Sequence, residues 1–224
     1  MEYAATPPAA LAGTQSFLTR VFGWMVVGLL VTAASAALIG SSDSMLADVT
    51  SNPILLIVLF VAQLGLVVAI SAGVNRMSTA TAGALFLVYS ALNGFIFSLV
   101  FELYTDESIF TTFLVAASLF AALALYGAVT KQDLTKLGPI LFGALIALIV
   151  ATIVNVFVGG STLYWITTYA GVLIFSGLTV YDMNKLKKYA ASGGETGTVQ
   201  GALALYLDFI NLFLFLLRIF GRSR

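Results

Sequence analysis

Apolar side chains fall into seven long, nearly continuous runs, separated by short polar or charged stretches. Each run approaches the ~20 residues that an α-helix needs to cross the ~30 Å hydrocarbon core of a bilayer. A membrane β-barrel would instead show short segments of alternating polarity, so the pattern predicts helices. The predicted spans are residues 21–39, 54–72, 80–101, 109–128, 139–158, 163–181 and 201–220.

The runs predict an all-α, polytopic membrane helix bundle with seven transmembrane helices. No linker is long enough to separate domains, so we expect one domain over residues 21–224. Residues 1–19 carry no Lys or Arg and include Pro7-Pro8, a pattern that lacks the basic leader of a signal peptide. We therefore expect residues 1–20 to form a flexible cytoplasmic tail.

The composition agrees with a membrane protein and excludes several other classes. Of the 224 residues, 60% are hydrophobic and 9% are charged, whereas a typical soluble domain has about 25% charged residues. The 10 Lys and Arg balance the 10 Asp and Glu, so no basic excess is present for nucleic acid. The absence of His and Cys excludes His-dependent catalytic triads and metal sites built on either residue. We expect the lipid bilayer as a partner, and neither nucleic acid nor a cofactor.

The loop charges predict the orientation of the chain. The second, fourth and sixth loops carry Arg76, the lysines of 131–136 and the lysines of 185–188, whereas the first loop carries only Asp43 and Asp48. Because positive loops stay in the cytoplasm, the N-terminus is predicted to lie there too. The last run then ends outside with its arginines, against the rule, so it either crosses fully or re-enters; its unbroken apolar length favours a full span.

Two aspartates stand apart from the loop charges. Asp208 lies about seven residues inside the last run, about 10 Å along its helix. A carboxylate at that depth costs several kcal/mol unless it is protonated, paired or hydrated, and it therefore indicates a functional position. Asp182 ends the sixth run, beside Lys185, where a charge near water carries little penalty.

Asp182 and Asp208 lie toward the same end of consecutive helices, so packing of those helices would bring them together. Two carboxylates in contact do not both ionise easily, and one keeps its proton until the pH rises. Their oxygens also suit a hard cation such as Ca²⁺, for which protons would compete. We therefore predict that this pair is a pH sensor and a ligand set for a transported or bound Ca²⁺.

Other polar residues predict a path through the bundle. Asn211 and Arg218 share one face of the last helix with Asp208, within about 80°, and such a stripe favours the bundle interior or a water-filled path. Tyr89 and Asn93 in the third run either bond to neighbouring helices or line the same path.

Arg76, at the end of the second run, has two interpretations. It is either a cytoplasmic anchor or the partner of a salt bridge to Asp182 or Asp208 that holds the bundle shut.

The last run contains a specific motif, Ala-Leu-Tyr-Leu-Asp-Phe-Ile-Asn-Leu-Phe at 204–213 and Leu-Arg-Ile-Phe-Gly at 217–221. This motif strongly resembles the C-terminal helix of the Bax inhibitor-1 family. Tyr181-Asp182 with the lysines that follow resembles the end of that family's sixth helix. The resemblance implies six helices around a central seventh, a bacterial inner membrane location, and a Ca²⁺ leak sensitive to pH.

The resemblance also implies residue roles. In the family, an aspartate pair on helices six and seven is the pH sensor, at positions that match Asp182 and Asp208. A basic residue at the end of helix two latches the closed state, and Arg76 matches that position. Some members carry an acidic residue within helix two, where this chain has Gln63 instead.

Two alternative functions come from other classes. Intramembrane aspartyl proteases also place two aspartates on consecutive helices, but the sequence before Asp208 is Leu-Tyr-Leu and not their Gly-x-Gly, so we expect no enzyme. The other alternative is a regulatory protein that binds other membrane proteins, in stress or quality control, without transport. The expected partners are thus calcium ions, protons and, in this alternative, membrane proteins.

Overall fold

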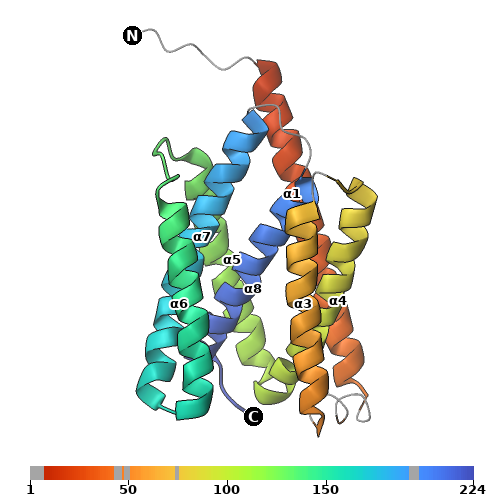
Figure 1. Ribbon diagram of the computed structural model, residues 1–224, viewed down its shortest axis with the longest axis vertical. Helices are drawn as coiled ribbons and strands as arrows, with labels where there is room; N and C mark the ends of the chain where they lie inside the picture. The colour runs from red at the N-terminus through yellow and green to blue at the C-terminus, as the bar shows by residue number, and fades with distance from the viewer. Residues whose placement is uncertain (1–7, 43–46, 48–50, 74–75, 192–196) are drawn as a thin grey trace. The chain divides into compact units, whose positions relative to one another are not determined.

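The computed structural model describes residues 8–42, 47, 51–73, 76–191 and 197–224. Residues 1–7 and the loop residues Asp43 and Asp48 lie outside this part. The described residues form long helices and one isolated backbone bridge, between Tyr104 and Ser223. The helices are α1 (Pro8–Gly40), α3 (Pro53–Gly73), α4 (Thr79–Leu103), α5 (Asp106–Val129), α6 (Leu137–Val158), α7 (Ser161–Ala191) and α8 (Thr198–Phe220) (Figure 1).

All seven predicted spans are present as helices, and each is long and apolar enough to cross a membrane. The last of them, α8, is one uninterrupted helix of 23 residues. A segment that entered and turned back would break within that length, so α8 agrees with a full crossing. The prediction of an all-α, polytopic membrane protein is confirmed.

Two helices are longer than the apolar runs that predicted them. α1 begins at Pro8, so residues 8–20 are helical, and the prediction of a flexible tail was wrong for them. α7 continues to Ala191. The two extensions pack together, because Phe17 is 1% exposed and its ring centroid lies 5.8 Å from that of Tyr189. Proline is well tolerated at the first position of a helix, where its missing N–H would have no partner.

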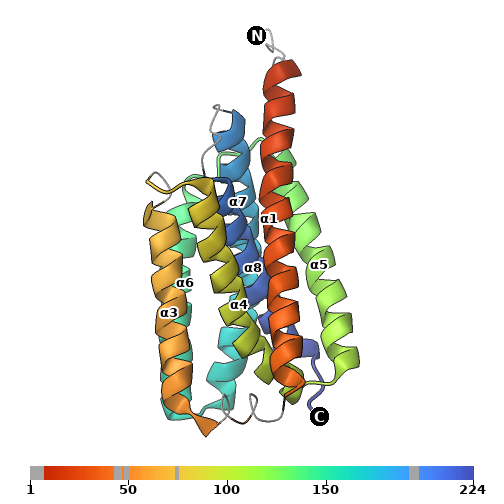
Figure 2. The ribbon, with the colours of Figure 1, turned by 90° about the vertical axis from the view of Figure 1, so that its right-hand side faces the viewer.

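The helices form two packing units. The first contains α1, α3, α4, the end of α7 from Leu186, and α8 through Tyr206. The second contains α5, α6, α7 through Lys185, and α8 from Leu207 onward. In the first unit α1 lies alongside α4 (Figure 2). Their backbones approach closely because a Cβ at Gly94 of α4 would collide with Ser35 of α1. A single domain over residues 21–224 stays a prediction.

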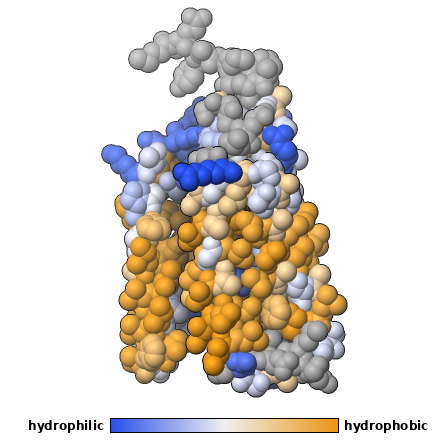
Figure 3. Space-filling model, turned by 45° about the vertical axis from the view of Figure 1, so that its right-hand side comes forward, coloured by the Kyte–Doolittle hydropathy of each residue, from blue (hydrophilic) through white to orange (hydrophobic). Residues whose placement is uncertain are grey.

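The helices present apolar side chains outward, as a lipid environment requires. Phe157 is 84% exposed and Leu173 is 73% exposed, and apolar side chains cover most of the face in Figure 3. The exception is α8: 61% of its most apolar stretch is buried, against 39% or less in the other helices described. This burial agrees with a central seventh helix.

Candidate functional site

Asp208 lies near the middle of α8 and is buried. Its side chain is 4% exposed, and its Oδ2 has no hydrogen-bond partner among the described residues. The next residue, Phe209, packs edge-on against Phe113 and Phe120 of α5, with centroid distances of 5.6 and 5.5 Å. A carboxyl oxygen without a partner in such an apolar setting carries a large energetic penalty. A membrane protein keeps such a group where function needs it.

Asp182 is half-buried in α7 and lies about as far from the α7–α8 connection as Asp208 does. It lies nine residues before Ala191, where α7 ends, and Asp208 lies ten residues after Thr198, where α8 begins. Both are therefore about 14 Å along their helices from the α7–α8 connection, at 1.5 Å per residue. Both aspartates belong to the second packing unit, and their pairing stays a prediction.

Close packing of α7 against α5 positions Asp182. Asn184, 2% exposed, donates a hydrogen bond from Nδ2 to the carbonyl oxygen of Gly127 at 3.3 Å. At Gly127 the helices are so close that a Cβ would lie 2.5 Å from the carbonyl oxygen of Val180. That neighbour is backbone and cannot turn aside as a flexible side chain could. The helix segment on both sides of Asp182 is therefore fixed against α5.

The other polar residues of α8 make local interactions. Asn211 donates from Nδ2 to the carbonyl oxygen of Leu207, one turn earlier, at 2.8 Å. The guanidinium of Arg218 lies over the rings of Tyr164 and Phe215, 5.5 and 5.0 Å from their centroids. These are cation–π distances, so Arg218 has protein partners for its charge. A polar path along these residues stays a prediction.

Tyr89 and Asn93 belong to a buried polar cluster in the first packing unit. At its centre is Tyr206, 0% exposed, with its hydroxyl 2.6 Å from Thr32 Oγ1 and its ring edge-on to that of Tyr89 at 5.9 Å. Thr32 donates to the carbonyl oxygen of Ser90 at 2.9 Å. The Nδ2 of Asn93 has no hydrogen-bond partner within the described ranges. The sequence did not reveal Tyr206 and Thr32 as members; the available signal was a tyrosine two positions before Asp208.

Arg76 lies in an exposed turn after α3, where its backbone N–H donates to the carbonyl oxygen of Gly73 at 2.8 Å. It belongs to the first packing unit, whereas both aspartates belong to the second. Its role as a latch stays a prediction. Gln63 in α3 is 6% exposed, and its Nε2 has no partner in the part of the chain that the structure describes.

The described residues contain no group of three or more His, Cys, Asp or Glu that could hold a metal ion. Asp182 and Asp208 would offer Ca²⁺ two carboxyl groups, whereas a resident Ca²⁺ site takes about six to eight oxygens. Two carboxyl groups alone therefore supply too few oxygens for a resident Ca²⁺ site, whereas either group can exchange a proton.

Comparison with known proteins gives consistent matches along the chain. The model of a family described as "Inhibitor of apoptosis-promoting Bax1" matches residues 14–224. The inner membrane protein YbhL of Escherichia coli K12 is 44% identical over 220 residues, which cover 95% of this chain and 94% of that protein. A protein of Deinococcus radiodurans is 41% identical over 228 residues, covering 100% of this chain and 97% of that protein. A membrane protein of Streptococcus pyogenes serotype M6 is 36% identical over 217 residues, covering 94% of each chain.

Proposed function

This chain belongs to the Bax inhibitor-1 family of membrane proteins, and from that premise we propose that it is a pH-sensitive calcium leak of the bacterial inner membrane. The observation that carries the proposal is the buried carboxyl group of Asp208, whose Oδ2 is unpartnered in the described residues and which shares the second packing unit with Asp182. Ionisable groups inside membrane proteins commonly mark ion pathways and proton relays.

Protonation of the aspartate pair controls the leak in this proposal. Two ionised carboxylates repel each other and attract a cation, whereas a protonated pair does neither. Arg76 holds the closed state through its attraction to the ionised pair, and protonation weakens that attraction. A change of ~1.4 kcal/mol in the balance between closed and open states changes their ratio about tenfold.

The polar residues that the proposal assigns to an ion path are Tyr89, Asn93, Asn211 and Arg218. Tyr89 carries a hydroxyl group, and Asn93 and Asn211 carry amides. Arg218 contributes a positive charge near the other end of α8, where its stacking on aromatic rings holds it in place. The alternating loop charges support an orientation with the N-terminus in the cytoplasm.

Ca²⁺ flux into proteoliposomes tests the proposal. The protein is reconstituted with a Ca²⁺ indicator inside, and initial rates are measured from pH 5 to 8 with equal pH on both sides. We expect flux through the wild type to vary with pH, and Asp182→Asn and Asp208→Asn to lose that variation because the amide cannot titrate. The matched control is Glu102→Gln, which removes an exposed carboxylate at the end of α4 and should keep the wild-type profile.

Two results would contradict the proposal. A pH profile unchanged in Asp208→Asn would remove the aspartate pair as the sensor. Wild-type flux no greater than that of empty liposomes would remove the leak itself.

A regulatory role without transport is the second candidate, and the description of the matched family as an inhibitor favours it. In that case the chain acts by binding another membrane protein. Site-specific photo-crosslinking in cells, combined with absent flux in liposomes, would support this role; flux that depends on both aspartates would contradict it.

A further inference from the structure

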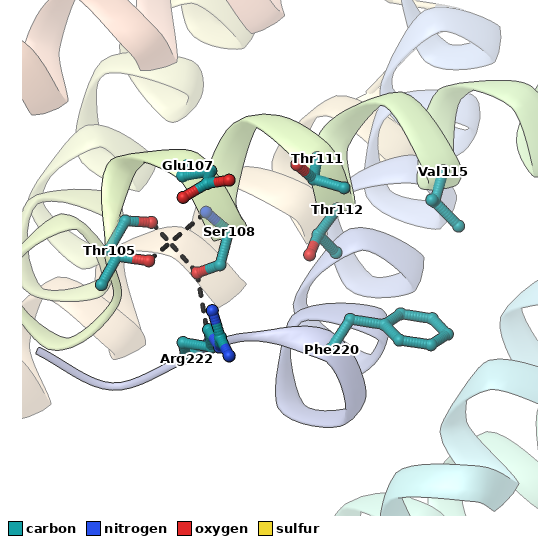
Figure 4. A pocket seen from close by; sticks show the side chains of 8 residues that line it. All are labelled: Thr105, Glu107, Ser108, Thr111, Thr112, Val115, Phe220 and Arg222. Carbon is teal, nitrogen blue, oxygen red and sulfur yellow. Dashed lines mark hydrogen bonds between the residues drawn. The ribbon is translucent and has the colours of Figure 1, made fainter.

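A pocket of about 300 Å³ lies where the first turns of α5 meet the residues that follow α8, within the second packing unit. Figure 4 shows its lining, which combines hydroxyl groups, one acidic side chain, one basic side chain and two apolar side chains. The position is the end of two membrane-spanning helices, which is the depth of lipid headgroups.

The inner wall of the pocket carries a hydroxyl group that lacks a partner. Thr112 is 1% exposed, and its Oγ1 has no hydrogen-bond partner among the described residues. In Figure 4 this hydroxyl points from α5 toward the side on which Arg222 and Phe220 lie. A buried polar group is nearly always hydrogen-bonded, so the unsatisfied hydroxyl points to a ligand that completes it.

The two charged side chains of the lining have opposite signs. Glu107 lies in the first turn of α5, and Arg222 follows the end of α8. The backbone of Arg222 is held on both sides, because its N–H donates to Ser108 Oγ at 3.2 Å and its carbonyl oxygen accepts from the N–H of Thr105 at 3.0 Å. The main chain is thus fixed while the guanidinium stays exposed to bind a ligand.

The apolar part of the pocket joins the lipid-facing surface. Phe220 is 55% exposed and Val115 is 40% exposed, and both line the pocket. Phe110 and Leu114, on the outer face of α5, are 64% and 49% exposed. A ligand bound at the charged end would therefore extend its apolar part along side chains that already face lipid.

We propose that this pocket binds the zwitterionic headgroup of an amine-bearing phospholipid, phosphatidylethanolamine. The phosphate accepts hydrogen bonds from the Arg222 guanidinium and from the free hydroxyl of Thr112. The ammonium group donates to the Glu107 carboxylate, and the acyl chains begin at Phe220 and Val115. A choline headgroup has no N–H to donate, and a glycerol headgroup has no cation for Glu107.

Native mass spectrometry of the full chain released from detergent tests the proposal. Phosphatidylethanolamine, phosphatidylcholine and phosphatidylglycerol are offered at equal concentrations, together with soluble glycerophosphoethanolamine. We expect one phosphatidylethanolamine to be retained about tenfold more than either other lipid, the effect of one charge-assisted hydrogen bond. The soluble headgroup should be retained weakly because it lacks the acyl chains.

Substitutions identify the site. Arg222→Gln, Glu107→Gln and Thr112→Val should each reduce retention of phosphatidylethanolamine severalfold, with Arg222→Lys intermediate because it keeps the charge but not the fork of donors. The matched controls, Arg224→Gln and Glu102→Gln, each remove one charge of the same sign at a residue outside the pocket lining. Both variants should retain phosphatidylethanolamine as fully as the wild type does.

Several outcomes would overturn the proposal. Equal retention of the three lipids by the wild type would mean that the bound lipid is ordinary boundary lipid. This comparison does not depend on whether any variant folds. A preference for phosphatidylglycerol that is lost only in Arg222→Gln would leave a simple anion site. Retention of the soluble headgroup as strongly as the lipid would leave a site for a free zwitterion.

Discussion

The hydrogen bond between Tyr206 and Thr32 gives a quantitative prediction about stability. The hydroxyl of Thr32 has one hydrogen, which it directs at the carbonyl oxygens of Gly28 and Ser90, 3.0 and 2.9 Å away. The short 2.6 Å contact is therefore donated by Tyr206 and accepted by Thr32. Tyr206→Phe removes the donor and keeps the ring, and Thr32→Val removes the acceptor with little change in shape.

The two single substitutions should differ in their effect. Loss of the Tyr206 hydroxyl removes one hydrogen bond, which contributes about 0.5–1.5 kcal/mol to the free energy of unfolding. Loss of the Thr32 hydroxyl leaves the buried Tyr206 hydroxyl without this acceptor, which costs about 1–3 kcal/mol. The side chains of Ser90 and Asn93 also lie beside the Tyr206 hydroxyl. They lower this cost when they take over from Thr32 as acceptors of its hydrogen bond.

The double variant separates the bond from other effects. Hydrogen bonds between membrane helices average about 0.6 kcal/mol in double-mutant cycles, with a maximum of about 1.7. This bond is short and fully buried, so we expect the double variant to be less destabilised than the sum of the singles by about 1 kcal/mol.

Reversible unfolding of the purified protein in mixed detergent micelles, followed by helix circular dichroism, measures the four free energies. Thr179→Val is the matched control, since Thr179 is also 0% exposed and its hydroxyl donates to the carbonyl oxygen of Phe175 in its own helix. It should be additive with Tyr206→Phe. Additivity within about 0.3 kcal/mol for Thr32→Val and Tyr206→Phe would refute the reasoning.

Two further predictions concern the second packing unit. Gly127→Ala should lower the free energy of unfolding by about 1–3 kcal/mol, because the added Cβ would lie 2.5 Å from the carbonyl oxygen of Val180. The control Gly143→Ala should be close to neutral, because its Cβ would have nothing within 4 Å; equal effects of the two substitutions in a thermal melt would contradict the close approach. Burial raises the pKa of Tyr104, as does nearby Tyr164, while Arg218 lowers it. The unfolded chain then releases this proton first, so stability falls as the pH rises above about 10, and Tyr104→Phe should reduce that fall in alkaline unfolding; an identical pH dependence would count against it.

The membrane-spanning parts of the fold could be predicted from the sequence because hydropathy is a property of each residue and its neighbours. The start of α1 could not be predicted in this way. Residues 8–20 are less apolar, and their helix is held by a contact between Phe17 and Tyr189 that are far apart in the chain. The Pro7-Pro8 pair favoured the prediction of a tail, although a proline such as Pro8 is compatible with the first position of a helix.

The candidate site could likewise be predicted from the sequence only where one helix or two consecutive helices determine it. The depth of Asp208 follows from its position within one helix, and the prediction that it pairs with Asp182 rests on two consecutive helices. Tyr206 and Thr32 lie 174 positions apart, and no periodicity relates them. The unpartnered hydroxyl of Thr112 had no signal at all, because one threonine near a helix start resembles any other.

Around the bridge between Tyr104 and Ser223, the end of the chain is held by main-chain atoms, so its fold depends little on which side chains stand there. The hydrogen bond from Thr105 to Arg222 uses main-chain atoms alone, so any residue other than proline at position 105 could donate it, and any residue at position 222 could accept it. Evolution can therefore place any residue except proline at position 222 without loosening the end of α8, because proline would lose the N–H that bonds to Ser108. If the proposed lipid site exists, variation at this position among natural relatives would report a change of ligand and not a change of fold.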